Sequence, residues 1–207
     1  MNNSKIFKIT FGEILFYLFW MVMSFIKAIG FYEGMTIYNV GLLFSFGCIL
    51  LKLILEEHTI QEWICILVLL ALGMICYVHS SEKTPLIYIM LIIGMKNVPI
   101  KRIFQTGLMI WVPCFIYRAF MEVTGLKTGM VLVHEKLGLG PIIRWSFGYP
   151  HPNVLQITYA VIASMILFLS HKKGKGQIKL LFLLFLGNCY VFLYSVSYTG
   201  FVLTILC

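Results

Sequence analysis

The residues best suited to chemistry in this chain lie close together, in the segment RWSFGYPHPN that covers residues 144–153. Arg144 carries a permanent charge on a planar guanidinium, which grips a phosphate through two parallel hydrogen bonds. His151 carries an imidazole, the side chain that most readily takes up a proton near neutral pH. One short segment therefore offers both a phosphate contact and a proton acceptor.

Two prolines in this segment predict where the following helix starts. Pro150 and Pro152 remove backbone donors and restrict the residues before them, so we expect the helix to begin after Pro152. Asn153 is then placed as the N-cap, its side-chain oxygen accepting from an early backbone N–H. A helix start of this kind presents unpaired N–H groups and a partial positive charge, which favour an anion beside Arg144.

The same electrostatics bear on the protonation of His151. Near a helix N-terminus and an arginine the imidazolium form is disfavoured, so the ring is expected to be neutral and able to act as a general base. A structural alternative fits the same residues: a stiff helix start with the histidine among lipid headgroups, and Arg144 anchoring a lipid phosphate. Spacing alone leaves both interpretations open.

The rest of the chain must hold this segment at a membrane. With 60% hydrophobic and 12% charged residues, the sequence lacks the polar surface of a water-soluble protein. A transmembrane helix needs about 20 mainly apolar residues. We predict an all-α, polytopic membrane protein with about seven complete spans in a single membrane domain. The start of an eighth span is cut off at Cys207, so we expect this domain to be part of a longer chain. The predicted spans are residues 14–29, 36–55, 63–78, 85–95, 103–123, 154–170 and 178–196.

Lysine and arginine predict the orientation, because short loops rich in them stay in the cytoplasm. With a cytoplasmic N-terminus, 10 of these residues lie inside and 5 outside. The segment 125–153 is then an outer loop along the membrane surface, with a short surface helix at residues 130–137 and Trp145 and Tyr149 at headgroup depth. The predicted orientation depends most on residues 85–95, because this run is short for a span. If it were a re-entrant segment, every later loop would lie on the opposite side of the membrane.

The net charge of +8 follows mainly from this topology. It does not indicate a nucleic-acid partner, which would require a basic patch on a soluble face. The six cysteines form no C-x-x-C or Cys/His cluster, so neither disulfides nor a metal site is expected.

Charged residues within the spans are the remaining candidates for function. Arg118 and Glu122 stand four residues apart on one helix face, so they suit a structural ion pair, with a second phosphate contact for Arg118 as the alternative. Pro113, one turn earlier, is expected to kink this helix and to open a lipid-facing cleft. The charged groups near span ends are expected to snorkel to the interface, namely Glu13, Lys27 and Lys52.

Two motifs resemble the bacterial O-antigen polymerase and O-antigen ligase superfamily, especially capsular or exopolysaccharide repeat-unit polymerases. The first is IIRWSFGYPHPN, in which Arg144, a Phe-Gly pair and His-Pro-Asn match the family pattern. The second is SVSYTGF, in which Ser197, Thr199 and Gly200 match Ser-Arg-Thr-Gly, while Tyr198 stands where the family has arginine.

The resemblance implies a metal-independent glycosyltransferase of the bacterial cytoplasmic membrane that uses no cofactor. Such enzymes transfer a glycan from undecaprenyl pyrophosphate to a sugar hydroxyl of the next lipid-linked repeat unit, and work beside flippases and chain-length regulators. His151 and Arg144 are then catalytic, and Asn153, Arg118, Ser197 and Thr199 contact the substrate. Sugar identity, linkage and the choice between polymerase and ligase stay open.

Two other classes of protein fit the composition. A secondary transporter or flippase is also all-helical, and its discontinuous helices resemble the proline-broken helix start here. However, such sites lie near the bilayer midplane within paired repeats, and neither feature appears in this sequence. A non-catalytic scaffold of a polysaccharide assembly complex would need neither Arg144 nor His151.

Overall fold

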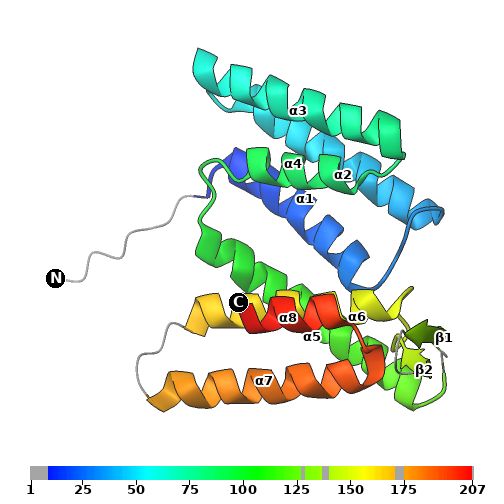
Figure 1. Ribbon diagram of the computed structural model, residues 1–207. Helices are drawn as coiled ribbons and strands as arrows, with labels where there is room; N and C mark the ends of the chain where they lie inside the picture. Colours follow the sequence, from blue (N-terminus) through cyan, green and yellow to red (C-terminus); the bar gives the residue numbers. More distant parts are fainter. Residues whose placement is uncertain (1–8, 127–128, 137–139, 171–174, 207) are drawn as a thin grey trace. The chain divides into compact units, whose positions relative to one another are not determined.

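The computed structural model describes residues 9–126, 129–136, 140–170 and 175–206. Six of the described helices, α1, α2, α3, α5, α6 and α7, are long and apolar enough to cross a bilayer. The predicted all-α, multi-pass fold is therefore confirmed. The elements in chain order (Figure 1) are α1 (Phe11–Ala28), α2 (Thr36–Leu55), α3 (Ile60–Ser80), α4 (Thr84–Gly94), α5 (Ile100–Val123), β1 (Val131–Lys136), β2 (Gly140–Trp145), α6 (Pro152–Ser170), α7 (Lys175–Ser195) and α8 (Tyr198–Leu206).

Helix α4 is the predicted span that falls short. It has 11 residues, and at 1.5 Å per residue it rises only about 16 Å, against a hydrocarbon thickness of about 30 Å. It follows α3 after residues 81–83 and packs against it. Helix α4 therefore reverses the chain direction without the length of a full span.

The segment after α5 contains a β-hairpin, so the predicted surface helix at residues 130–137 is wrong. Strands β1 and β2 pair antiparallel, with Val131 opposite Trp145 and Lys136 opposite Gly140. The sequences VLVHEK and GPIIRW carry β-branched residues that favour a pleated, half-exposed surface. Pro141 would also interrupt a helix but is tolerated in a two-stranded edge.

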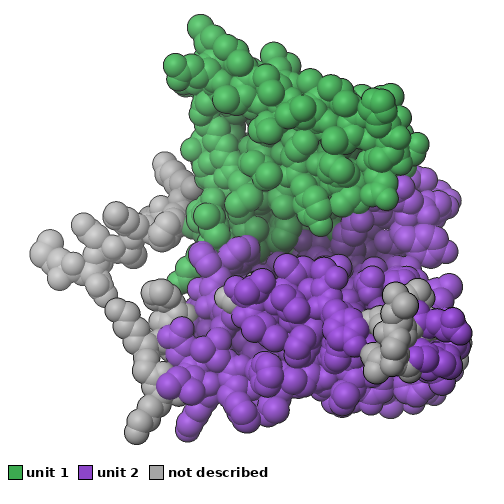
Figure 2. Space-filling view, viewed as in Figure 1, with its two compact units in different colours: residues 1–23, 40–103 green, residues 24–39, 104–207 purple. Residues whose placement is uncertain are grey.

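The chain divides into two compact units (Figure 2): residues 1–23 and 40–103, and residues 24–39 and 104–207. In the second unit α6 packs against both α7 and α8, and β2 packs against α7. The helices come close where Gly200 of α8 faces α6: a Cβ at this position would lie 2.6 Å from Gln156 Cγ. A small residue at a helix crossing is typical of membrane proteins, because it lets the two backbones approach.

Candidate functional site

The motif loop (residues 146–151) connects the hairpin to α6 through a tight turn. The Tyr149 N–H donates to the Ser146 carbonyl at 3.0 Å. The two central residues have positive φ, 45° at Phe147 and 74° at Gly148. Glycine adopts this conformation freely, whereas an aromatic residue there is a genuine outlier that costs about 1–3 kcal/mol. Strain of this kind persists only where the surroundings hold it in place.

Aromatic contacts with α7 supply that support. The Trp145 ring stacks on the Tyr194 ring with centroids 5.7 Å apart. The Phe147 ring meets the same tyrosine edge-on at 4.7 Å. Both sides of the strained turn are thus fixed to one helix.

Arg144 is buried at this junction, with 7% of its surface exposed. Its Nε donates to the Ser195 carbonyl at 2.7 Å, and its Nη2 donates to Asn153 Oδ1 at 2.5 Å. Ser195 is the last residue of α7, where the helix dipole favours a cation. Burial lowers the pKa of the guanidinium from its ordinary value. Arg144 therefore joins β2, α6 and α7, and its guanidinium lies beside Asn153 at the start of α6.

Helix α6 begins at Pro152, one residue before the predicted cap, so the assignment of Asn153 as N-cap is wrong. His151 occupies the cap position. Its Nδ1 accepts from the Asn153 N–H at 3.1 Å, and its carbonyl accepts from the Val154 N–H at 2.9 Å. Proline suits the first helical position because its missing N–H would have no partner there in any case.

This cap changes two expectations about the site. The first N–H groups of α6 are already used by His151, so the helix start does not offer the unpaired donors that were expected for an anion. Because a backbone N–H can only donate, His151 Nδ1 is the acceptor in this hydrogen bond. In this geometry the Nδ1 lone pair is engaged in the cap.

The second motif lies at the junction of α7 and α8. Ser197 is buried, its N–H donating to Ser195 Oγ at 3.3 Å and its carbonyl accepting from Phe201 N–H at 3.0 Å. Thr199 is exposed. Tyr198 is half exposed and lies edge-on to Phe192. Among the described residues, neither Ser197 nor Thr199 forms a hydrogen bond with Arg144.

Sequence reasoning missed the polar residues that connect this junction to the spans. Ser195 Oγ donates to Gln156 Oε1 at 2.6 Å, Gln156 Nε2 donates to Asn188 Oδ1 at 2.6 Å, and Asn188 Nδ2 donates to the Phe201 carbonyl at 3.1 Å. All three side chains are buried. The signal was an amide in the middle of an apolar run, since buried amides in a membrane require partners.

Arg118 contacts the same loop but does not form the predicted ion pair with Glu122. No ion pair joins these two side chains in the described part of the chain, which contains every acidic residue of the sequence. Instead, Arg118 Nε and Nη2 both donate to the Ile29 carbonyl, at the end of α1. Its guanidinium lies 5.7 Å from the centroid of the Tyr149 ring. Tyr149 is therefore buried over Arg118.

Glu122 instead accepts a hydrogen bond from the Gly129 N–H. It thus holds the chain between α5 and β1, which explains its carboxylate without an arginine partner.

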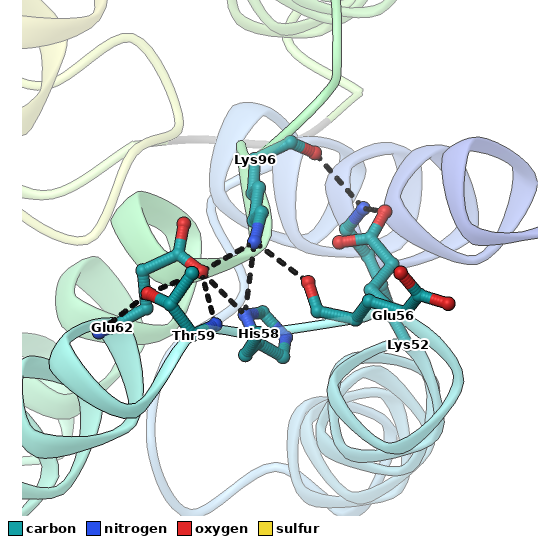
Figure 3. Close-up of polar contacts among 7 residues, drawn as sticks. Lys52, Glu56, His58, Thr59, Glu62 and Lys96 are labelled. Carbon is teal, nitrogen blue, oxygen red and sulfur yellow. Dashed lines mark hydrogen bonds and ion pairs between the residues drawn. The ribbon is translucent and has the colours of Figure 1, made fainter.

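A second polar cluster lies in the other unit, at the α2–α3 turn (Figure 3). Lys52 is 1% exposed; it pairs with Glu56 and donates to the Lys96 carbonyl at 3.1 Å. The Lys96 ammonium donates to Glu62 Oε2 and to the Glu57 carbonyl, both at 2.8 Å. Snorkelling of Lys52 was therefore a wrong expectation, because a carboxylate one turn later allows the ammonium to be buried.

Glu13 departs from the snorkelling prediction in the same way. It is buried, and its carboxylate pairs with the Arg102 guanidinium at 2.7 Å. The Tyr17 hydroxyl donates to the same oxygen at 3.0 Å. Both corrected residues were near span ends, where the sequence shows the charge but not its partner from another helix.

The fold and these sites define a multi-pass helical membrane protein with a β-hairpin and the motif loop between α5 and α6. Among the described residues no group of His, Cys, Asp or Glu side chains is arranged to hold a metal ion. No protein-family model, curated protein or solved structure matches this chain.

Proposed function

We propose that the protein is a polysaccharide polymerase that transfers a glycan from undecaprenyl pyrophosphate to a sugar hydroxyl of the next lipid-linked repeat unit. The observation that supports it best is the buried Arg144 guanidinium, hydrogen-bonded to Asn153 beside His151 in a loop that contains a strained turn. A cation, an amide and an imidazole from one motif thus lie together where α6 begins.

In the proposed reaction Arg144 contacts the pyrophosphate of the donor. Two of its five N–H groups are used in the bonds to Ser195 and Asn153, so donors remain for a phosphate oxygen. The hydroxyl oxygen of the acceptor bonds to the anomeric carbon of the donor sugar. The bond from that carbon to the pyrophosphate oxygen breaks, and the pyrophosphate leaves with the electron pair.

His151 takes the proton of the acceptor hydroxyl. In the described geometry Nδ1 accepts from Asn153 N–H, so the ring must first release this hydrogen bond or exchange its proton between the two nitrogens. The cap is worth about 1 kcal/mol, which is small beside the binding energy of a large lipid-linked substrate. Substrate binding can therefore supply the energy for this rearrangement.

Replacing His151 with asparagine separates capping from base catalysis. Asparagine is among the best N-cap residues but has no basic group, so His151→Asn should fold with unchanged thermal stability and make no long polymer. His151→Ala is the matched control: it loses the cap as well, and should lower the stability by about 1 kcal/mol. Polymer length on lipid-linked glycans, measured with the full-length protein in cells and in proteoliposomes, gives the result. Normal long chains from His151→Asn would refute the base assignment and leave a structural cap.

Arg144 needs a test that accounts for its structural bonds. Arg144→Lys keeps a positive charge near the α7 terminus but loses the fork-shaped donor set, so it should retain partial activity. Arg144→Ala should retain almost none. Both variants are compared at matched amounts of folded protein, because Arg144 also connects β2 to Ser195. Full activity of folded Arg144→Ala would contradict the phosphate contact and favour a scaffold.

A further inference from the structure

Arg118 lines an apolar cleft in the second unit that the proposed reaction does not use. The cleft has a volume of about 480 Å³, within the range of small-molecule sites. Apart from Arg118, its lining comes from the end of α1 with the turn after it and from one stripe of α5. The residues are Phe25, Ile29, Phe31, Pro113, Cys114, Tyr117 and Met121.

The charge in this cleft lacks an acidic partner. Arg118 is 5% exposed, and none of the acidic side chains, all of which the structure describes, pairs with it. Its protein partners are the Ile29 carbonyl and the face of Tyr149. A helix C-terminus contributes only a partial negative charge. A buried cation in an apolar setting therefore retains an unmet preference for an anion.

Two glycines leave space around the guanidinium. A Cβ at Gly30 would lie 2.9 Å from Arg118 Nη2, and a Cβ at Gly148 would lie 3.4 Å from Nη1. Nη1 has no hydrogen-bond partner among the described residues, so one end of the guanidinium keeps its donors available. The nearest acid, Glu122, is occupied with the Gly129 N–H.

Arg118 lies near the end of α5, where a span approaches the lipid headgroups. It stands five residues before the end of the helix at Val123, which is about 7–8 Å along the helix axis. The apolar lining extends from there towards the helix centre, through Tyr117 and Pro113. Phe25 and Tyr117 are nearly half exposed, so the cleft is open to lipid along its length. A phosphate on Arg118 would thus have apolar surface directly below it.

We propose that this cleft binds a glycerophospholipid of the surrounding bilayer, with its phosphate on Arg118 and an acyl chain along Phe25, Tyr117 and Pro113. A phosphate and an apolar chain joined in one molecule complement both features of the cleft. Bilayer phospholipid is the occupant present at the highest local concentration. The site does not depend on the proposed glycosyl transfer, because it uses a different arginine and requires no reaction.

The first test needs no variant. The purified full-length chain is delipidated in detergent and titrated with dioleoylphosphatidylglycerol, dioleoylglycerol, inorganic phosphate or farnesyl phosphate, with binding followed by native mass spectrometry and thermal stabilisation. The phospholipid should bind and stabilise, whereas the diacylglycerol and inorganic phosphate should not. Equal binding of the diacylglycerol would overturn the role of Arg118. Equal binding of inorganic phosphate would overturn the role of the cleft, and tighter binding of farnesyl phosphate would overturn the assignment to a bilayer lipid.

Variants then locate the site. Arg118→Gln can still donate one hydrogen bond to the Ile29 carbonyl but carries no charge, and should weaken phospholipid binding by about tenfold to a hundredfold. Met121→Trp should fill the cleft and abolish binding while Arg118 stays in place. Lys27→Gln is the matched control: it removes a cation near the end of α1 that does not line the cleft. Unchanged binding by Arg118→Gln and Met121→Trp, or an equal loss in Lys27→Gln, would refute the proposed site.

Discussion

Replacing Gly200 with alanine should separate α8 from α6. The added Cβ would lie 2.6 Å from Gln156 Cγ, 2.9 Å from Gln156 Cβ and 3.4 Å from its carbonyl carbon. Gln156 is fully buried, and its amide donates to Asn188 and accepts from Ser195. Neither Gln156 nor the α8 backbone can move by several tenths of an ångström without disturbing these bonds.

The magnitude follows from three contributions. Overpacking costs about 1–3 kcal/mol, and weakening two buried hydrogen bonds costs about 1 kcal/mol each. Alanine returns about 1 kcal/mol through its better helix propensity. The net loss of unfolding free energy is therefore about 2–4 kcal/mol, which corresponds to a fall in Tm of about 4–16 °C for a chain of this size.

Thermal unfolding of the purified protein in detergent, followed by loss of the monodisperse peak on size exclusion, measures this effect. Gly47→Ala in α2 is the matched control, because a Cβ at Gly47 meets no heavy atom within 4 Å. It should leave the Tm unchanged or raise it slightly. A Tm of Gly200→Ala within about 2 °C of the unmodified protein would refute the close contact between α6 and α8.

Two further predictions concern charged residues. Arg118→Ala should lower the Tm. Adding Glu122→Ala should not restore the Tm, because the two side chains form no ion pair. Recovery of the Tm in the double variant would show that they do interact. Glu56→Ala removes the carboxylate that pairs with the buried Lys52 ammonium, and should cost about 3–5 kcal/mol. The neighbouring Glu57→Ala alters an exposed side chain and should stay within about 0.5 kcal/mol; equal effects in the thermal-unfolding assay would contradict the buried pair.

The positions of the spans could be predicted because a bilayer requires long uninterrupted apolar runs. The run predicted at residues 36–55 has the bounds of α2 (Thr36–Leu55), and the run at 103–123 lies within α5. Short sequence patterns predicted the local secondary structure and the helix starts less well. Residues 130–137 are too few to distinguish helical from alternating periodicity, and the structure forms a hairpin there. The sequence predicts a helix start after Pro152, whereas the helix begins at Pro152, because proline is also suited to the first helical position.

The partners of the polar groups could not be predicted, because they come from distant elements. Arg118 bonds to a carbonyl 89 residues earlier in the chain, and Arg144 to one 51 residues later. Both arginines use helix C-termini in place of carboxylates, and sequence spacing gives no sign of such a partner. The i, i+4 rule correctly placed Arg118 and Glu122 on one helix. In the structure, however, Arg118 donates to the Ile29 carbonyl and Glu122 accepts from the Gly129 N–H.

The contacts of the first unit also bear on the direction of α4. Lys96, just after α4, contacts Glu62 at the start of α3. Glu13 at the start of α1 pairs with Arg102 at the start of α5. Helix α4 thus carries the chain back towards the level where α3 begins, despite its 11 residues. A re-entrant α4 that returned to the end of α3 would not bring Lys96 to Glu62.

The length of α5 and the charges at its start predict the side on which residues 125–153 lie. Helix α5 has 24 residues, enough to cross a bilayer, so the hairpin that follows it is expected on the opposite side of the membrane from the residues at the start of α5. Lys101 and Arg102 lie at the start of α5, and because lysine and arginine favour the cytoplasmic side, we predict that α5 starts there. In a background without native cysteines, Lys136→Cys should react with a membrane-impermeant maleimide in intact cells, whereas Lys173→Cys should react only after permeabilisation. Labelling of Lys173→Cys with protection of Lys136→Cys would invert the orientation, and would place the motif loop on the side where flipped lipid-linked sugars never arrive.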